Sequence, residues 1–141
     1  MRIAAALLAL ASWPVAAQVG FYKLSAPPGS ARIYGEMCIE KGSGKSLRVR
    51  LFGSYCPTVG DDCANVRFDG MEFEAQPTQR GLSFKNQTCM LNVSLRKHGA
   101  TVTQQGHCTD YDLLAGAYVK VAPEVWEDDC SPNGSDETHH K

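Results

Sequence analysis

The segment Gly42-Ser43-Gly44-Lys45-Ser46 ends like a phosphate-binding loop, in which backbone N–H groups cradle phosphates and a lysine neutralises their charge. The full loop reads G-x-x-x-x-G-K-[ST], so its first glycine falls at position 39. That position holds Ile39. Because half of the motif is missing, we interpret the segment as a flexible connection between two strands, in which Gly42 and Gly44 allow the chain to reverse.

Catalytic residue types are present, but no catalytic motif is. The chain has neither a G-x-S-x-G nor an H-E-x-x-H pattern. Its densest polar group runs from His107 through Asp110 and Tyr111 to Asp112, and His107 could exchange protons with Glu72 or Asp112. No spacing requires these groups to meet. We therefore expect a non-catalytic protein, with a small secreted hydrolase or ribonuclease-like enzyme centred on His107 as one alternative.

The sequence also lacks a plausible set of metal ligands. There is no C-x-x-C pair, and His139-His140 stands two residues from the C-terminus, where it could hold an ion only weakly. Asp61-Asp62 supplies two adjacent carboxylates, which fall far short of a calcium site. We expect no metal and no cofactor.

The loop Gly42-Ser43-Gly44-Lys45 resembles one found in bacterial periplasmic lysozyme inhibitors, which are small β-barrels with a Ser-Gly-Ser-Gly-x-Lys loop. The similarity covers four residues, lacks the leading serine and sets the lysine one place early, and Leu47 stands where an aromatic residue is expected. The resemblance implies that Lys45 enters the acidic cleft of a target enzyme. Inhibition of a cell-wall hydrolase such as lysozyme is therefore a further alternative.

The two ends of the chain predict export and an acidic tail. Arg2, an apolar run and Val15-Ala16-Ala17 have the layout of a signal peptide over residues 1–17. Residues 18–122 carry 12 Lys and Arg against 9 Asp and Glu, and we assign them to a single β domain. Residues 123–141 carry one Lys against six acids, and we expect a largely flexible tail tethered by Cys130. No segment is long enough to span a membrane.

Six cysteines in an exported chain predict three disulfides. If His98-Gly99 is a two-residue hairpin turn, Leu95 lies opposite Val102 and Cys89 lies opposite Cys108, so we predict a Cys89–Cys108 cross-strand bond. The remaining pairs that we favour are Cys56–Cys63, which closes a short turn-rich stretch, and Cys38–Cys130.

Period-two alternation dominates the chain and predicts short strands. Leu47, Val49 and Leu51 alternate with polar residues, and Ile33–Glu40 is expected to pair with them. Asp69-Gly70 between alternating apolar residues indicates a tight type I′ hairpin. Gly116–Val121 supplies a last strand. The predicted fold is all-β, a small disulfide-stabilised antiparallel β-sandwich or barrel.

These expectations favour function by binding. A rigid β scaffold presents its loops, here Lys41–Lys45, Tyr55–Asp62, Lys97–Gly99 and Thr109–Leu114. We expect a secreted, effector-like protein similar in format to the small secreted effectors of fungi, or a periplasmic one if bacterial, that binds an extracellular protein or glycan. A nucleic-acid partner is not expected, because no basic cluster with interleaved aromatics is present. Candidate binding residues are Ser43, Lys45, Tyr55, His98, His107, Asp110 and Tyr111, and glycosylation sequons begin at Asn86, Asn92 and Asn133.

Overall fold

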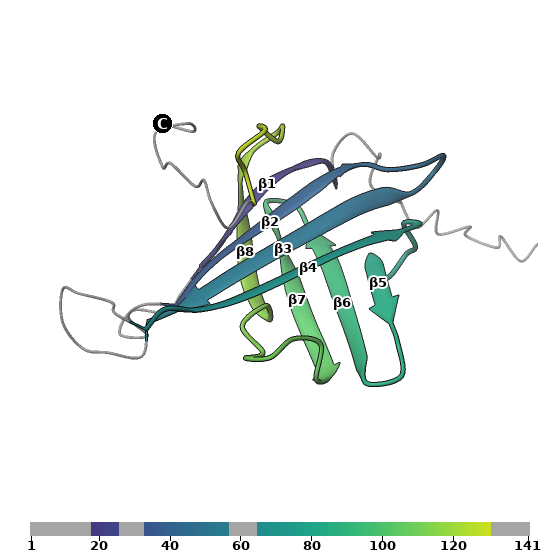
Figure 1. The fold of residues 1–141 in the computed structure, drawn as a ribbon. Helices are drawn as coiled ribbons and strands as arrows, with labels where there is room; N and C mark the ends of the chain where they lie inside the picture. The colour runs from purple at the N-terminus through teal and green to yellow at the C-terminus, as the bar shows by residue number, and fades with distance from the viewer. Residues whose placement is uncertain (1–17, 26–32, 57–64, 131–141) are drawn as a thin grey trace, which may run out of the picture.

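The computed structural model describes residues 18–25, 33–56 and 65–130, which form eight strands and no helix (Figure 1). The strands are β1 (Gly20–Leu24), β2 (Ile33–Lys41), β3 (Leu47–Tyr55), β4 (Arg67–Ala75), β5 (Leu82–Lys85), β6 (Cys89–Arg96), β7 (Gly99–Gly106) and β8 (Gly116–Ala122). The all-β prediction is therefore confirmed. No described helix is long and apolar enough to cross a membrane.

All eight strands belong to one antiparallel sheet that curls into a nearly closed barrel. Its order is β4-β3-β2-β1-β8-β7-β6-β5, so two four-stranded meanders join where β1 pairs with β8. In Figure 1 the long strands β2, β3 and β4 run obliquely across β6 and β7. The seam lies between β4 and β5, which share no ladder in the described residues; Phe73 and Phe84 meet across it with ring centroids 5.6 Å apart.

The core follows the predicted alternation. Leu47, Val49 and Leu51 are at most 2 % exposed and point into the barrel, where Leu91 and Val93 from β6 meet them. Successive side chains of a strand point to opposite faces, so the intervening residues form the outer surface. The inward and outward faces of these strands are thus set by the order of residue types alone.

The first part of the expected tail packs against the outside of β1 and β2. Cys130 is bonded to Cys38 across a Cα–Cα distance of 6.1 Å, and both lie in a small apolar cluster with Phe21 and Ala122. The backbone N–H of Cys130 also donates to the buried carboxylate of Glu36 at 3.2 Å. The predicted Cys38–Cys130 bond is confirmed, and it fastens residues 123–130 to the sheet.

The Cys89–Cys108 bond is also confirmed, although the register that suggested it is wrong. Leu95 pairs with Ala100, and Cys89 pairs with Gly106 rather than with Cys108. Gly106 has a φ of 77°, and past this bend Cys108 comes within 4.9 Å of Cys89, measured between Cα atoms. The third bond involves Cys56, which is disulfide-bonded; Cys63 lies outside the described residues.

The predicted hairpin turn at Asp69-Gly70 is wrong. Both residues lie in the middle of β4, which pairs with β3 along its whole length, from Arg67 opposite Tyr55 to Ala75 opposite Leu47. The Asp69 carboxylate is 4 % exposed and points inward, where it binds the segment between β7 and β8. Asp69-Gly70 stays extended because the Asp69 carboxylate accepts hydrogen bonds from Thr109 and Leu113, and these tertiary contacts outweigh the local preference of Asp-Gly for a turn.

Candidate functional site

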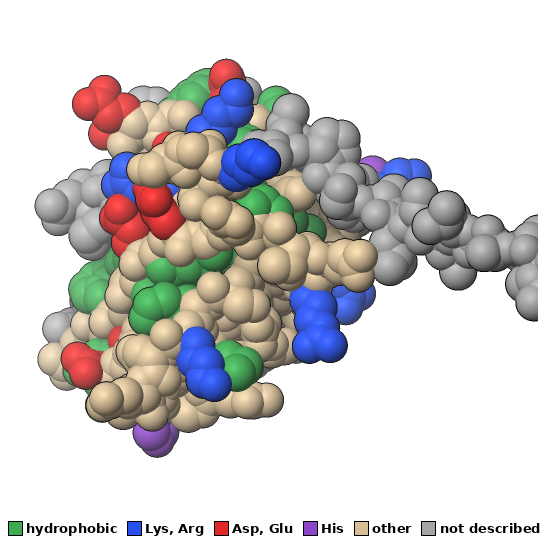
Figure 2. Space-filling model, turned by 90° about the vertical axis from the view of Figure 1, so that its right-hand side faces the viewer, with side chains coloured by type: hydrophobic (Ala, Val, Ile, Leu, Met, Phe, Trp, Pro, Cys, Tyr) green, Lys and Arg blue, Asp and Glu red, His purple; other side chains and the backbone are tan. Residues whose placement is uncertain are grey.

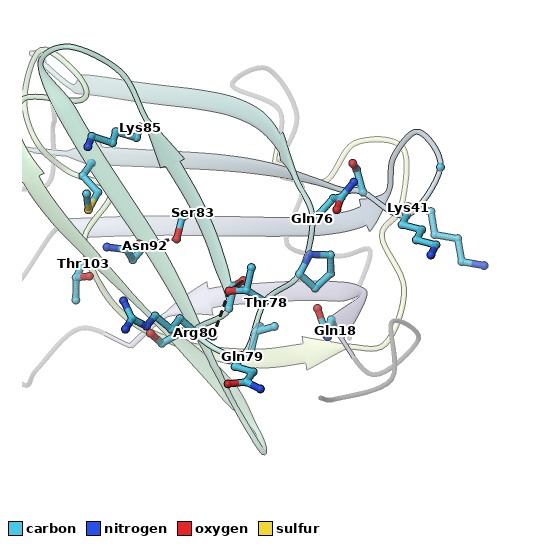
Figure 3. Close-up of a pocket in the computed structure, with 18 residues that line it drawn as sticks. Gln18, Lys41, Gln76, Thr78, Gln79, Arg80, Ser83, Lys85, Asn92 and Thr103 are labelled. Carbon is cyan, nitrogen blue, oxygen red and sulfur yellow. Dashed lines mark hydrogen bonds between the residues drawn. The ribbon is translucent and has the colours of Figure 1, made fainter. Parts of the chain in front are cut away.

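A groove of about 1180 Å³ connects one end of the barrel with the outer face of β5–β7 (Figure 3). We call it the basic groove. In Figure 3, Lys41 lies on the right, and Lys85 and Arg80 lie on the left, with Arg80 below Lys85. Its lining residues are Gln18, Lys41, Gly44, Lys45, Ser46, Gln76, Pro77, Thr78, Gln79, Arg80, Gly81, Ser83, Lys85, Met90, Asn92, Ser94, Leu95 and Thr103.

The β2–β3 hairpin loop brings two lysines to this groove. The predicted connection is present: the Gly42 N–H donates to Ser46 O at 2.9 Å, and the Ser46 N–H donates to Ser43 O at 3.0 Å. Gly44 has a φ of 59°, a left-handed conformation that favours glycine. The hairpin projects at the right of Figure 1, and Lys41 and Lys45 are exposed on it.

The turn before β5 brings Arg80. Thr78 and Gly81 exchange backbone hydrogen bonds of 2.9 and 3.0 Å, and the Thr78 hydroxyl accepts a further bond from the Arg80 N–H at 3.2 Å. Gly81 has a φ of 100°, and a Cβ at this position would lie 1.9 Å from Val93 O. The turn is therefore closely packed on β6. The backbone that carries Arg80 has little conformational freedom.

The charged side chains that line the groove are all positive. It contains four cations, Lys41, Lys45, Arg80 and Lys85, and no Asp or Glu among its lining residues. None of the four forms an ion pair with a described residue. On the outer face of β2–β4, by contrast, Arg48 pairs with Glu72 at 2.6 Å and Arg50 with Glu40 at 3.2 Å. The groove thus carries positive charge that no carboxylate of its lining offsets.

Only Lys45 of the predicted binding residues lines the basic groove; Ser43 lies in its loop. Tyr55 ends β3 at the opposite end of the barrel, and His98 lies in the β6–β7 turn outside the groove lining. Sequence reasoning missed Lys41 as a site residue, together with Arg80 and Lys85. Their charge was visible, but no local spacing indicates that three separate segments converge.

The polar group at His107 does assemble in part. The His107 Nδ1 lies 3.0 Å from Asp112 Oδ2, and Gln104 Nε2 donates to Asp112 Oδ1 at 2.6 Å. The hydrogen bond from Gln104, and after it the one from His107, lowers the pKa of Asp112 below its ordinary 3.8. Asp112 has a φ of 55°, which is rare for a residue other than glycine. Glu72 is not part of this cluster, since it pairs with Arg48.

Asp69 holds the neighbouring loop from inside the barrel. Its carboxylate accepts hydrogen bonds from the Thr109 hydroxyl at 2.9 Å and from the backbone N–H groups of Tyr111 at 3.1 Å and Leu113 at 2.8 Å. On the outside, the Arg67 guanidinium lies 5.3 Å from the centre of the Tyr111 ring. Asp110 is exposed on the same loop. These candidate residues therefore lie together, away from the basic groove.

Two of the three sequons fall on described surface. Asn86 is exposed at the β5–β6 turn, where its carboxamide accepts from the Thr88 N–H at 2.9 Å. Asn92 is half-buried on β6, inside the basic groove. Asn133 lies outside the described residues, as do Asp61-Asp62 and His139-His140. The described residues contain no group of three or more His, Cys, Asp or Glu side chains placed to hold a metal ion.

Comparison with known proteins adds no relative: no family model, no curated protein and no solved structure matches this chain significantly.

Proposed function

We propose that this protein acts by binding an acidic partner outside the cell, in the manner of a small secreted effector, and that the basic groove is its binding surface. The observation that carries the proposal is the set of four cations in a groove whose lining has no carboxylate. Lysine and arginine that lack an internal partner attract external anions, and a partner's charge speeds association as well as strengthening it.

Two different kinds of contact support this proposal. Arg80 stands on a turn held by hydrogen bonds between Thr78 and Gly81, and a guanidinium can bind a carboxylate through two parallel hydrogen bonds. Lys41 and Lys45 stand on a projecting hairpin and act as point charges of longer reach. A partner therefore meets a guanidinium on a hydrogen-bonded turn and two adaptable lysines, in addition to Lys85 on β5.

The proposal is tested by affinity capture with the oxidised chain, followed by titration of the captured partner against variants. We expect Lys45→Gln/Arg80→Gln to weaken binding about tenfold or more, because two charge-assisted contacts are lost. Arg96→Gln/Lys97→Gln is the matched control, since it removes two exposed cations, neither of which lines the groove. Equal loss in both variants contradicts a groove-specific site.

A narrower candidate is inhibition of a carbohydrate-cleaving hydrolase. Such enzymes carry a pair of carboxylates in their cleft, and Lys45 at the exposed end of the hairpin has the charge and reach to enter it. This candidate predicts stoichiometric loss of the target's activity, which Lys45→Ala relieves. Tight binding to an acidic protein with no loss of its activity would retain the binding proposal and reject inhibition.

The His107–Asp112 contact favours a third candidate, a small secreted hydrolase. The Nδ1 contact with Asp112 orients the ring so that Nε2 can act as a base. Catalysis then requires turnover of RNA or polysaccharide by the purified protein, and His107→Ala must abolish it. If turnover persists in that variant, His107 is not the catalytic group.

A further inference from the structure

The outer face of β5–β7 differs in chemistry from the rest of the barrel surface. Its outward side chains form rows across the strands: Ser83, Asn92 and Thr103 are paired neighbours, and so are Lys85, Met90 and Gln105. We call this set the outer strip; its members are Ser83, Lys85, Met90, Asn92, Ser94, Arg96, Thr101, Thr103 and Gln105. It contains two cations, no acid and no aromatic residue.

Part of the outer strip forms the floor of the basic groove. Six of its residues line the groove: Ser83, Lys85, Met90, Asn92, Ser94 and Thr103. Figure 2 shows a face on which uncharged polar side chains and the backbone make up most of the lower half, with scattered Lys and Arg, while most Asp and Glu lie toward the upper left. The floor is therefore a hollowed surface of hydroxyl and amide groups beside positive charge.

The polar groups of this floor have hydrogen-bonding capacity to spare. The Ser83 hydroxyl donates to Asn92 Oδ1 at 2.6 Å, which leaves the Asn92 amide N–H groups without a described protein partner. The Lys85 ammonium likewise has no ion-pair partner among the described residues. In Figure 3, Ser83, Asn92 and Thr103 lie in a row, with Lys85 on one side of the row and Arg80 on the other. Donors for hydroxyl groups thus lie between donors for anions.

We infer that the outer strip binds an extended acidic glycan, whose hydroxyls contact Asn92, Ser83 and Thr103 and whose carboxylates or sulfates contact Lys85 and Arg80. A protein partner needs an apolar anchor at the centre of its interface, and Met90 is the only apolar side chain of the strip. A single-stranded nucleic acid needs aromatic rings on which its bases stack, and the strip has none. A polyhydroxylated anion needs neither.

This inference shares Arg80 and Lys85 with the proposed function but does not use the hairpin lysines Lys41 and Lys45, so variants at the hairpin separate the two. A glycan attached to Asn92 would cover the strip, so the test uses the oxidised full chain produced without N-glycosylation. Calorimetry measures binding to a sulfated heparin hexasaccharide, a carboxylated galacturonate hexamer and the neutral maltohexaose. Poly-L-glutamate and oligothymidylate of matched charge serve as peptide and nucleic-acid probes.

We expect one or both acidic hexamers to bind more tightly than maltohexaose and poly-L-glutamate, and their relative affinities tell which anion the strip prefers. Lys85→Gln should weaken that binding about threefold to fivefold, the effect of one exposed charge contact, and added salt should weaken it further. Asn92→Ala/Thr103→Ala should weaken it while leaving the salt dependence unchanged, because only neutral hydrogen bonds are lost.

Two controls separate this inference from the proposed function. Lys41→Gln/Lys45→Gln, at the hairpin, should change the affinity for the glycan by less than about twofold. The same variant should weaken binding of the captured acidic partner. Lys97→Gln, an exposed cation outside both the strip and the groove lining, should change neither. The inference is overturned if neither acidic hexamer binds, if maltohexaose, poly-L-glutamate or oligothymidylate binds as tightly, or if Lys85→Gln binds like the parent protein.

Discussion

Asp69 and Leu113 are separated by 44 residues, and the backbone N–H of Leu113 donates to the Asp69 carboxylate at 2.8 Å. Together with the bonds from Thr109 and Tyr111, this contact ties the β7–β8 connection to the middle of β4, close to the sheet's open seam. The loop that carries Asp110 and Tyr111 is thus positioned by a strand of the other meander. One buried carboxylate joins the two halves of the barrel.

Replacing this carboxylate should destabilise the protein. Asp69→Asn keeps one acceptor oxygen but turns an amide N–H₂ toward backbone donors, so we expect a loss of about 1–3 kcal/mol in the free energy of unfolding. Urea denaturation measures it. Asp110→Asn, on the exposed part of the same loop, is the matched control and should change stability by less than about 0.5 kcal/mol. A near-zero effect at Asp69 means that the three hydrogen bonds contribute nothing net.

The two described disulfides should contribute unequally. Cys38–Cys130 spans 92 residues and Cys89–Cys108 spans 19, so the first constrains the unfolded chain more, by about 1–1.5 kcal/mol in the chain-entropy model. We expect Cys38→Ala/Cys130→Ala to lower the free energy of unfolding more than Cys89→Ala/Cys108→Ala does. The Cys38→Ala/Cys130→Ala variant should also show faster hydrogen exchange at the β2 residues next to position 38, because residues 123–130 are no longer fastened to this strand. The reverse order of stabilities contradicts this account.

The turn that carries Arg80 should tolerate no side chain at Gly81. In Gly81→Ala the new Cβ meets Val93 O at 1.9 Å, and the left-handed φ is also unfavourable, so we expect a loss of more than about 2 kcal/mol. Gly44→Ala is the comparison: its φ is also positive, but no atom lies within 4 Å of the added Cβ, and its loss should be about 1 kcal/mol. If the two variants lose the same free energy of unfolding, the positive φ alone accounts for both losses and the contact with Val93 O adds nothing.

Alkaline pH should destabilise the protein through its buried tyrosines. Burial raises the pKa of Tyr22 from 10.0 to about 12, and its hydroxyl donates to Gln18 O at 2.8 Å. Because the folded pKa is the higher one, this stability is fully present below pH 10 and is lost as pH rises towards 12, by about 2–3 kcal/mol for a two-unit shift. Burial also raises the pKa of Tyr118, in the same direction.

Denaturant titrations at several alkaline pH values measure this loss, and the ultraviolet absorbance of tyrosinate reports the ionisation itself. Tyr22→Phe is the diagnostic variant: it should lose about 1 kcal/mol at neutral pH with the hydrogen bond, but fall less steeply above pH 10. A parent protein whose stability is flat between pH 10 and 12 contradicts the burial effect on Tyr22.

Strand positions could be predicted from the sequence, because each depends on local information. The two disulfide predictions are correct on other grounds: Cys38–Cys130 joins residues 92 apart in the sequence, and the register that suggests Cys89–Cys108 is one that the chain does not adopt. Leu91 and Val93 alternate with polar neighbours, and a strand's period of two then places them inside. The β6–β7 register could not be obtained this way. It depends on whether the turn is centred on Lys97-His98 or His98-Gly99, and the chain adopts the former, with Arg96 opposite Gly99.

The sequence by itself determined an all-β chain with an exposed lysine-bearing loop at Lys41–Lys45, because residue alternation and glycine placement act over a few positions. Only the tertiary structure decided that Arg80 and Lys85 join Lys45 in one acid-free groove. It also decided that Asp69-Gly70 stays extended. Both outcomes depend on contacts between residues distant in sequence, where the closing of the sheet, rather than local preference, sets which groups meet.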